Sequence, residues 1–129
     1  MKKLVTVLVI GVIIGLSVGL PVFCANPNVT KSVVASDDAS AVIVVRVTSS
    51  GQSIYGITIT DDSASIEDIV SPKGWSGLAS DGHIVFATVD HPITSGSSKS
   101  FRIVSTNANA AFSVTLRDAN RLLVVKKDI

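Results

Sequence analysis

The sequence predicts an all-β fold, an antiparallel β-sandwich of eight or nine short strands that follows an N-terminal hydrophobic segment. Two observations carry this prediction. Beyond residue 25 the chain is rich in Val, Ile, Thr and Ser, three of which favour strands. Apolar residues alternate with polar ones, and turn signals recur about every 8–12 residues. This spacing is typical of jelly-roll or immunoglobulin-like sandwiches.

The strongest strand signal lies in the first half of this β-rich part. A short strand is expected at residues 30–36, followed by a long one at residues 39–50. In the long strand, alternation places four apolar residues on one face: Ala41, Ile43, Val45 and Val47. Residues 54–60 repeat the pattern, and one of their sides is formed by Tyr55, Ile57 and Ile59. Both runs therefore present one face to a hydrophobic core.

The second half contains weaker but regular strand signals. Five strands are expected, at residues 64–70, 82–89, 99–105, 111–117 and 121–126. A turn at residues 72–74 precedes Trp75, and Asp118-Ala119-Asn120 is typical of a tight hairpin. Three aromatic residues lie on apolar faces of these strands, and we expect them in the core: Phe86, Phe101 and Phe112.

Residues 1–25 have the layout of a secretory signal peptide. Lys2 and Lys3 form a basic start, and an uncharged apolar run extends from residue 4 to residue 22. Small residues then precede the polar Asn26, as at a cleavage site. We therefore expect a secreted or otherwise extracytoplasmic protein.

Three alternatives exist for the processing of this segment. We favour cleavage after Cys24 or Ala25, which leaves residues 26–32 as a short tail and residues 33–129 as one β-sandwich domain. The second alternative retains the segment as a membrane anchor, because its apolar run approaches the ~20 residues that span a bilayer. Lipidation of Cys24 is disfavoured because the bulky Phe23 precedes it.

Charge and cysteine content exclude several classes of function. Without Lys2 and Lys3 the chain holds nine basic and ten acidic residues, so it offers no basic field for nucleic acid. The only cysteine is Cys24, so the domain has no disulfide and no thiol nucleophile. Contact with a membrane is expected only through the N-terminal segment, if it stays uncleaved.

The sequence contains no recognisable catalytic arrangement. The two histidines, His83 and His91, would lie at opposite ends of one strand, about 26 Å apart, which is too far to share a metal ion. No G-x-S-x-G motif marks a serine as a nucleophile. We therefore expect no enzyme activity, no catalytic residue, no metal ligand and no cofactor.

The acidic residues suggest calcium as a possible bound ion. Three acidic pairs occur, at Asp37-Asp38, Asp61-Asp62 and Glu67-Asp68, and Asp118 adds another turn residue. Loops at one end of a sandwich could converge to supply the roughly six to eight oxygens that calcium takes. Asp also favours turns because its side chain binds the backbone, and this second explanation is favoured since no repeated Asp spacing exists.

Two aromatic residues and one asparagine are candidate contact or modification sites. Trp75 and Tyr55 could form a platform on which a sugar ring stacks, although Trp75 could equally cap the edge of the core, and we favour the core position. Asn28-Val29-Thr30 matches the N-glycosylation sequon, so Asn28 is a candidate glycosylation site in a host that modifies secreted proteins.

The middle of the chain carries a definite order of strands, turns and loops: Tyr55–Ile59, Ile66–Val70, Gly74-Trp75, Asp81–Phe86, Ser95–Ser98, Phe101–Ile103 and Phe112–Asn120. Over residues 33–125 this order resembles cohesin-type modules and similar secreted sandwiches of the carbohydrate-binding-module type. One departure is the Thr60–Ser63 stretch, which stands where cohesins often have a Tyr-Asp-Pro-type turn.

The resemblance implies a secreted or cell-surface interaction module that binds an extracellular protein and catalyses no reaction. A carbohydrate-binding module is the first alternative, with Trp75 and Tyr55 in contact with a polysaccharide. A structural subunit of a surface filament or layer is the second alternative, with the N-terminal segment retained or an edge strand donated between subunits.

Overall fold

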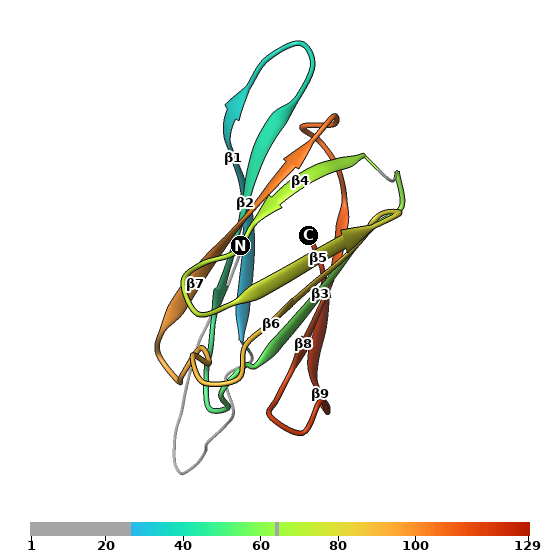
Figure 1. Cartoon of the computed structure of the whole chain (residues 1–129). Helices are drawn as coiled ribbons and strands as arrows, with labels where there is room; N and C mark the ends of the chain where they lie inside the picture. The colour runs from blue at the N-terminus through green and yellow to red at the C-terminus, as the bar shows by residue number, and fades with distance from the viewer. Residues whose placement is uncertain (1–26, 64) are drawn as a thin grey trace.

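A computed structural model describes residues 27–63 and 65–129, and its regular structure is all β-sheet. Within these two ranges, nine strands form two antiparallel sheets that pack face to face, which confirms the predicted all-β sandwich (Figure 1). The strands are β1 (Asn28–Ser36), β2 (Ala41–Thr48), β3 (Gly56–Asp61), β4 (Ile66–Val70), β5 (Ser76–Ser80), β6 (His83–Ala87), β7 (Ser98–Ser105), β8 (Phe112–Arg117) and β9 (Leu123–Asp128).

The expected signal peptide, including its anchor and lipidation alternatives, lies outside the described residues. Within residues 27–63 and 65–129, no helix is long and apolar enough to cross a membrane.

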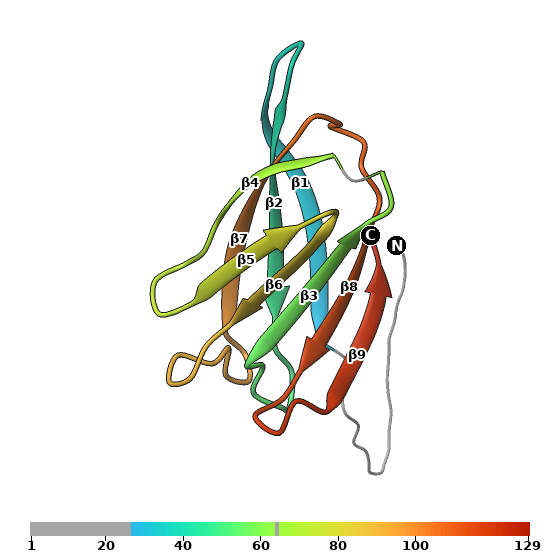
Figure 2. The ribbon, with the colours of Figure 1, turned by 45° about the vertical axis from the view of Figure 1, so that its right-hand side comes forward.

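The chain moves repeatedly from one sheet to the other. One sheet has four strands in the order β1-β2-β7-β4, and the other has five in the order β5-β6-β3-β8-β9. Figure 2 shows the outer face of the five-stranded sheet and, at the top, the β1–β2 hairpin, which extends beyond the rest of the sandwich. The bottom end of the sandwich in this view holds the β6–β7 and β8–β9 loops.

Alternation along each strand fills the space between the sheets with apolar side chains. The predicted inward face of β2, from Ala41 to Val47, is buried, as are Ile57 and Ile59 of β3. Phe86, Phe101 and Phe112 are buried as well, which confirms the predicted core positions. Burial of such large apolar groups is the main source of stability for a domain without disulfides.

The first strand is longer than the sequence predicts. It begins at Asn28, whose backbone pairs opposite Thr48 of β2, so most of the expected 26–32 tail belongs to the four-stranded sheet. Val29 is buried in the core, while its neighbours Asn28 and Thr30 face solvent. The first residues of β1 are mostly polar and show only a short apolar–polar alternation, which is a weak strand signal. Main-chain hydrogen bonds to β2 hold them in the sheet.

One strand was absent from the sequence expectation. β5, with the sequence Ser-Gly-Leu-Ala-Ser, has low β-propensity and five exposed residues, since it is the edge of its sheet. It pairs with β6 through a two-residue loop, Asp81-Gly82, in which both residues have positive φ angles of 48° and 81°. Asp-Gly is a strong hairpin signal for such a loop, so this dipeptide could have identified β5.

The turn before Trp75 depends on Gly74, which has a φ of 84°. A Cβ atom built on Gly74 would lie 2.3 Å from Cγ of His91, so a side chain at this position meets a ring as well as backbone strain. We expect Gly74→Ala to lower the free energy of unfolding by about 1–2 kcal/mol, the usual cost of a left-handed non-glycine residue. Urea denaturation measures this loss.

The matched control for this prediction is Gly74→Ala combined with His91→Ala. Removal of the His91 ring relieves the two shortest contacts and leaves the one with Cβ of His91 at 2.7 Å, so the double variant should recover part of the lost stability. A Gly74→Ala protein as stable as the wild type would contradict the proposed role of this turn.

Candidate functional site

The candidate site is a groove on the outer face of the five-stranded sheet. Because Ile57 and Ile59 face the core, alternation turns Gly56 and Thr58 of β3 outward. Strand register then sets Gly56 between Ala87 of β6 and Arg117 of β8. Gly56 and Ala87 are small, so the outer face of the sheet is hollow where these two residues lie side by side.

Loops form the walls of the groove at the lower end of the sheet in Figure 2. One wall comes from Thr88 and Val89 after β6, and the other from Asp118, Ala119 and Arg121 after β8. Tyr55, which precedes β3, completes the lining. The groove is open to solvent and has a volume of about 800 Å³, which is within the range of roughly 300–1,000 Å³ found for ligand sites.

Backbone hydrogen bonds hold both walls against the floor. The Tyr55 N–H donates to the carbonyl of Arg117 at 2.9 Å, and the Tyr55 carbonyl accepts from the Thr88 N–H at 3.0 Å. The Thr88 hydroxyl donates to the carbonyl of Gly74 at 2.8 Å and accepts from the His91 N–H at 2.9 Å. The groove is therefore braced before any ligand arrives.

The β8–β9 wall is organised by Asp118. One of its carboxylate oxygens accepts from the N–H groups of Asn120 and Leu122 at 2.9 and 3.0 Å, so the tight hairpin predicted at residues 118–120 is confirmed. The Arg117 guanidinium donates to the carbonyl of Arg121 at 3.3 Å. Among the described residues, the one ion pair joins His91 and Asp90. No carboxylate of these residues therefore lies within 4.0 Å of the guanidinium group of Arg117 or Arg121.

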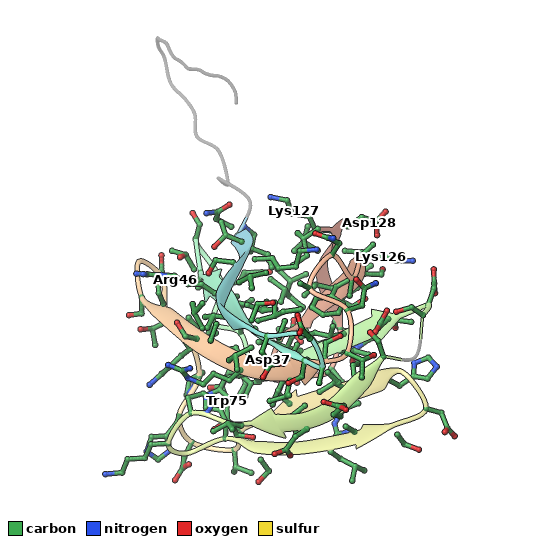
Figure 3. All side chains as sticks on the ribbon, turned by 90° about the horizontal axis from the view of Figure 1, so that it is seen from above. Asp37, Arg46, Trp75, Lys126, Lys127 and Asp128 are labelled. Atoms are coloured by element: carbon green, nitrogen blue, oxygen red, sulfur yellow. The ribbon has the colours of Figure 1, made fainter. Side chains whose placement is uncertain are left out.

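The two predicted ligand contacts have different surroundings. Tyr55 is half-buried and lines the groove. Trp75 is only 7% exposed, its ring meets that of Phe101 edge to face at 5.1 Å, and its indole N–H donates to the carbonyl of His91 at 2.9 Å. Figure 3 places Trp75 between the two sheets.

Trp75 therefore takes the favoured core position and does not form a sugar-stacking platform. The reason is physical: the ring buries its faces against Phe101 and other core residues, while its one polar atom finds a backbone acceptor. Tyr55 and Trp75 do not act together on one surface, because Trp75 is absent from the lining of the groove.

The histidines and acidic pairs do not assemble a metal site in the part of the chain that the structure describes. His83 begins β6 and His91 lies in the loop that follows β6, and no group of three or more His, Cys, Asp or Glu side chains comes together among residues 27–63 and 65–129. Asp37 instead accepts from the N–H groups of Ala39 and Ser40, both at 2.8 Å, and organises the β1–β2 turn. Turn stabilisation accounts for Asp37 and Asp118 alike.

Among the residues that the structure describes, one carboxylate, that of Asp61, is buried, and its hydrogen bonds lead from one sheet to the other. Asp61 at the end of β3 accepts from the N–H and hydroxyl of Ser63 and from the N–H and hydroxyl of Ser65, at 2.6–3.0 Å. Ser105 of β7 lies 2.7 Å from the Ser65 hydroxyl oxygen and accepts from the Asn107 N–H at 3.0 Å. The Ser65–Ser105 contact extends the hydrogen bonds of Asp61 to β7, where the Ser105 hydroxyl also donates to the Asn107 carbonyl at 3.2 Å.

This Asp–Ser cluster is structural. Burial raises the pKa of Asp61, but the hydrogen bonds from Ser63 and Ser65 lower it by a larger amount. The pKa therefore lies below its ordinary value, and the carboxylate is a poor base. His83 lies on β6 opposite Thr60, with its exposed side chain on the outer face, away from the buried cluster. The elements of a Ser-His-Asp triad are therefore not brought together here.

The remaining candidate, Asn28, is exposed at the first position of β1. The sequon lies within a strand, whereas the sequence suggested a tail. Asn28 faces solvent, so glycosylation there remains a prediction.

A second surface lies on the outer face of the four-stranded sheet. Val42 and Val104 are paired across β2 and β7, and Val44 and Val70 lie on either side of Arg102. Val70 is exposed, and the other three valines are half-buried. This valine face also carries the exposed Arg102, and it lies on the opposite side of the sandwich from the groove.

No protein-family model and no curated protein matches this sequence. Solved structures are similar in fold. An uncharacterized protein from Nocardia farcinica with an immunoglobulin-like fold has a TM-score of 0.58 and 12% identity, over 74% of this chain and 80% of that chain.

Two chitin-binding domains from archaea are also similar. ChBD2 from Thermococcus kodakarensis has a TM-score of 0.51 and 15% identity, over 81% of this chain and all 100% of that chain. The chitin-binding domain of a Pyrococcus furiosus chitinase has a TM-score of 0.50 and 12% identity, over 82% of this chain and 98% of that chain. At these identities the similarity establishes the immunoglobulin-like sandwich fold. A cohesin is not among these neighbours.

Proposed function

We propose that this protein is a carbohydrate-binding module that catalyses no reaction and uses the groove on the five-stranded sheet to hold a polysaccharide. The carrying observation is the groove itself, with its small-residue floor at Gly56 and Ala87 and with Tyr55 in its wall. Similarity to two chitin-binding domains supports binding over catalysis. The proposal favours the carbohydrate-binding alternative over cohesin-like protein binding.

The groove combines the chemistry that a saccharide needs. Val85 and Val89 offer apolar surface to the C–H groups of a sugar ring, and Val89 is 90% exposed. Thr58 on the floor offers a hydroxyl, and Tyr55 combines an aromatic ring with a phenolic group. Because the groove is open to solvent, a bound saccharide can be part of a longer chain, as in a polysaccharide. Secretion, as expected from residues 1–25, would bring the module to such a ligand.

Gly56→Leu tests the groove without a threat to the fold. A Cβ atom at Gly56 lies 3.7 Å from Cβ of Arg117 and 3.9 Å from the Phe86 carbonyl oxygen, which are ordinary contacts. The leucine should fill the floor and weaken polysaccharide binding at least about ten-fold, while thermal stability is kept or rises, since glycine is a poor strand residue. Depletion of the protein from solution by insoluble chitin, cellulose or xylan measures the binding.

The matched control is Ser100→Leu, which places the same side chain on the exposed outer face of β7 in the other sheet. We expect this variant to bind as the wild type does. Equal binding by Gly56→Leu and the wild type would move the ligand site away from the groove. Absence of binding to every polysaccharide tested would overturn the carbohydrate-binding proposal.

The valine face on the four-stranded sheet supports a second candidate function, the binding of an extracellular protein. Exposed apolar residues gathered on a surface and bordered by polar ones mark interaction sites, and here the valines surround the exposed Arg102. Val44→Asp would place a charge in the centre of this face and should abolish capture of a protein partner from the extracellular fraction of the native host, while polysaccharide binding stays unchanged. The structural-subunit alternative remains a prediction.

A further inference from the structure

We infer that the groove selects an acidic polysaccharide, a saccharide chain that carries carboxylate or sulfate groups, through Arg117 and Arg121. This inference rests on the proposed carbohydrate-binding function and specifies its ligand. Two arginines, Arg117 and Arg121, line one groove, and the only carboxylate among the described residues of that lining, that of Asp118, accepts hydrogen bonds from its own loop.

Arg117 lies on the floor of the groove. It is the outward residue of β8 beside Gly56, and it is half-buried. One guanidinium nitrogen donates to the Arg121 carbonyl at 3.3 Å, which fixes the orientation of the group. A guanidinium has five N–H donors in a rigid fork, so most of them stay free for a ligand. Partial burial strengthens a charged hydrogen bond formed there.

Arg121 forms the rim above Arg117. It belongs to the β8–β9 loop and is held at a positive φ of 63°, a conformation that the Asp118 hydrogen bonds and the Arg121 N–H bond to the Asp118 carbonyl (3.0 Å) stabilise. Within the described residues, neither this guanidinium nor that of Arg117 has a carboxylate within 4.0 Å. Two cations without an acidic partner in one groove favour an anion there, because each fork matches the two oxygens of a carboxylate or sulfate.

The positive charge is a local property of the groove. Beyond residue 25 the chain has nine basic and ten acidic residues, so general attraction to polyanions is not expected. The groove lining holds two arginines against one aspartate. Neutral hydroxyl groups would leave these guanidinium groups without a charged partner, whereas an acidic sugar would pair with them beside the apolar surface of Val85 and Val89.

The test compares polysaccharides that differ only in charge. Isothermal titration at low salt uses polygalacturonate against its methyl ester, and dextran sulfate against dextran, with polyglutamate as an anionic chain without sugar. We expect the acidic polysaccharide of at least one pair to bind at least about ten-fold more tightly than its neutral counterpart, as for one charged hydrogen bond, and the preference to decline as salt rises. The pair that shows the preference identifies the anion as carboxylate or sulfate.

Arg117→Met keeps the aliphatic stem and should remove most of this preference. Arg121→Met is the second variant, because it leaves the hydrogen bond from Arg117 to the loop backbone intact. Arg102→Met is the matched control, since it removes the same charge from the exposed face of the other sheet. Thermal melts of all three variants establish that they are folded.

Each outcome decides the inference. Loss of the preference in both groove variants, but not in Arg102→Met, supports it. Equal binding of acidic and neutral polysaccharides would overturn it and leave the carbohydrate-binding proposal standing, whereas failure to bind any polysaccharide would overturn both. Polyglutamate binding as tight as that of the acidic polysaccharides, or equal losses in all three variants, would show general charge attraction and overturn the inference as well.

Discussion

Replacement of Phe101 by alanine should lower the free energy of unfolding by about 3–5 kcal/mol, the usual range for a buried phenylalanine. Phe101 lies on β7, between β2 and β4, and is completely buried. Its ring is 5.1 Å from that of Trp75 and 4.7 Å from that of Phe86, so its loss leaves a cavity between two further aromatic rings. The neighbours are themselves fixed by packing, and they cannot close that cavity fully.

Denaturation in urea measures this change, with an unchanged slope as evidence that unfolding stays two-state. Phe112→Ala should fall in the same range, because Phe112 is also buried, although it lacks an aromatic neighbour of this kind and has Lys31 above its ring at 5.3 Å. Val89→Ala, at an exposed position, is the control and should change stability by less than about 0.5 kcal/mol. A loss well below about 1 kcal/mol in Phe101→Ala would contradict the core packing described here.

Asp61→Asn should cost about 2–3 kcal/mol of stability at neutral pH. Asp61 is 4% exposed and accepts four hydrogen bonds, and an amide nitrogen in place of one oxygen would face donors instead of accepting from them. The Ser65–Ser105 contact, which joins the two sheets at this end, would be weakened, because Asp61 would no longer hold the Ser65 side chain in place. A buried donor left without an acceptor accounts for most of the expected loss.

The same network gives stability a defined dependence on pH. The folded-state pKa of Asp61 lies below its ordinary value of 3.8: burial raises it, and the hydrogen bonds of Ser63 and Ser65 outweigh that effect. A lowered folded-state pKa contributes stability that is full above the unfolded-state pKa and is lost as pH falls from there through the folded-state pKa. The wild type should therefore lose stability below about pH 4, and Asp61→Asn should lose less over that interval.

Asp37→Asn provides the comparison. The pKa of Asp37 is also lowered, by hydrogen bonds from the Ser40 and Ala39 backbone, but this carboxylate is exposed in the β1–β2 turn, so the effect of its replacement should be much smaller. Thermal melts of the wild type and both variants between pH 2 and pH 7 test the prediction. Equal pH dependence in the wild type and Asp61→Asn would contradict it.

The sequence contains most of the information on the sandwich core but little on the groove. Alternation in residues 41–47 and at Phe101 and Phe112 identifies the inward faces correctly, because burial of one strand face leaves a period of two in the sequence. β5 leaves no such period, since all of its residues are exposed at a sheet edge. Only the Asp81-Gly82 hairpin signal marks its presence.

The groove arises from register, which a single sequence does not display. Ala87, Gly56 and Arg117 belong to strands that are far apart in the chain, and they become neighbours only when β3 pairs with β6 and β8. Of the two aromatic candidates, Tyr55 lines the groove and Trp75 does not. The burial of Trp75 depends on its contacts with Phe101 and with the carbonyl of His91, and neither contact can be predicted from the position of Trp75 in the sequence.

The division of the groove into a floor from strands and walls from loops has a consequence for how such a domain can diversify. The floor is coupled to the core, because Gly56 adjoins the buried Ile57, and Arg117 adjoins the buried Leu116. The loop residues Ala119 and Asn120 are exposed and contribute no side chain to the core, and Asp118 binds only the backbone of Asn120, so changes of side chain there are cheap in stability. A library restricted to this loop would explore new ligands on an unchanged scaffold, much as antibody domains vary their loops on a constant framework.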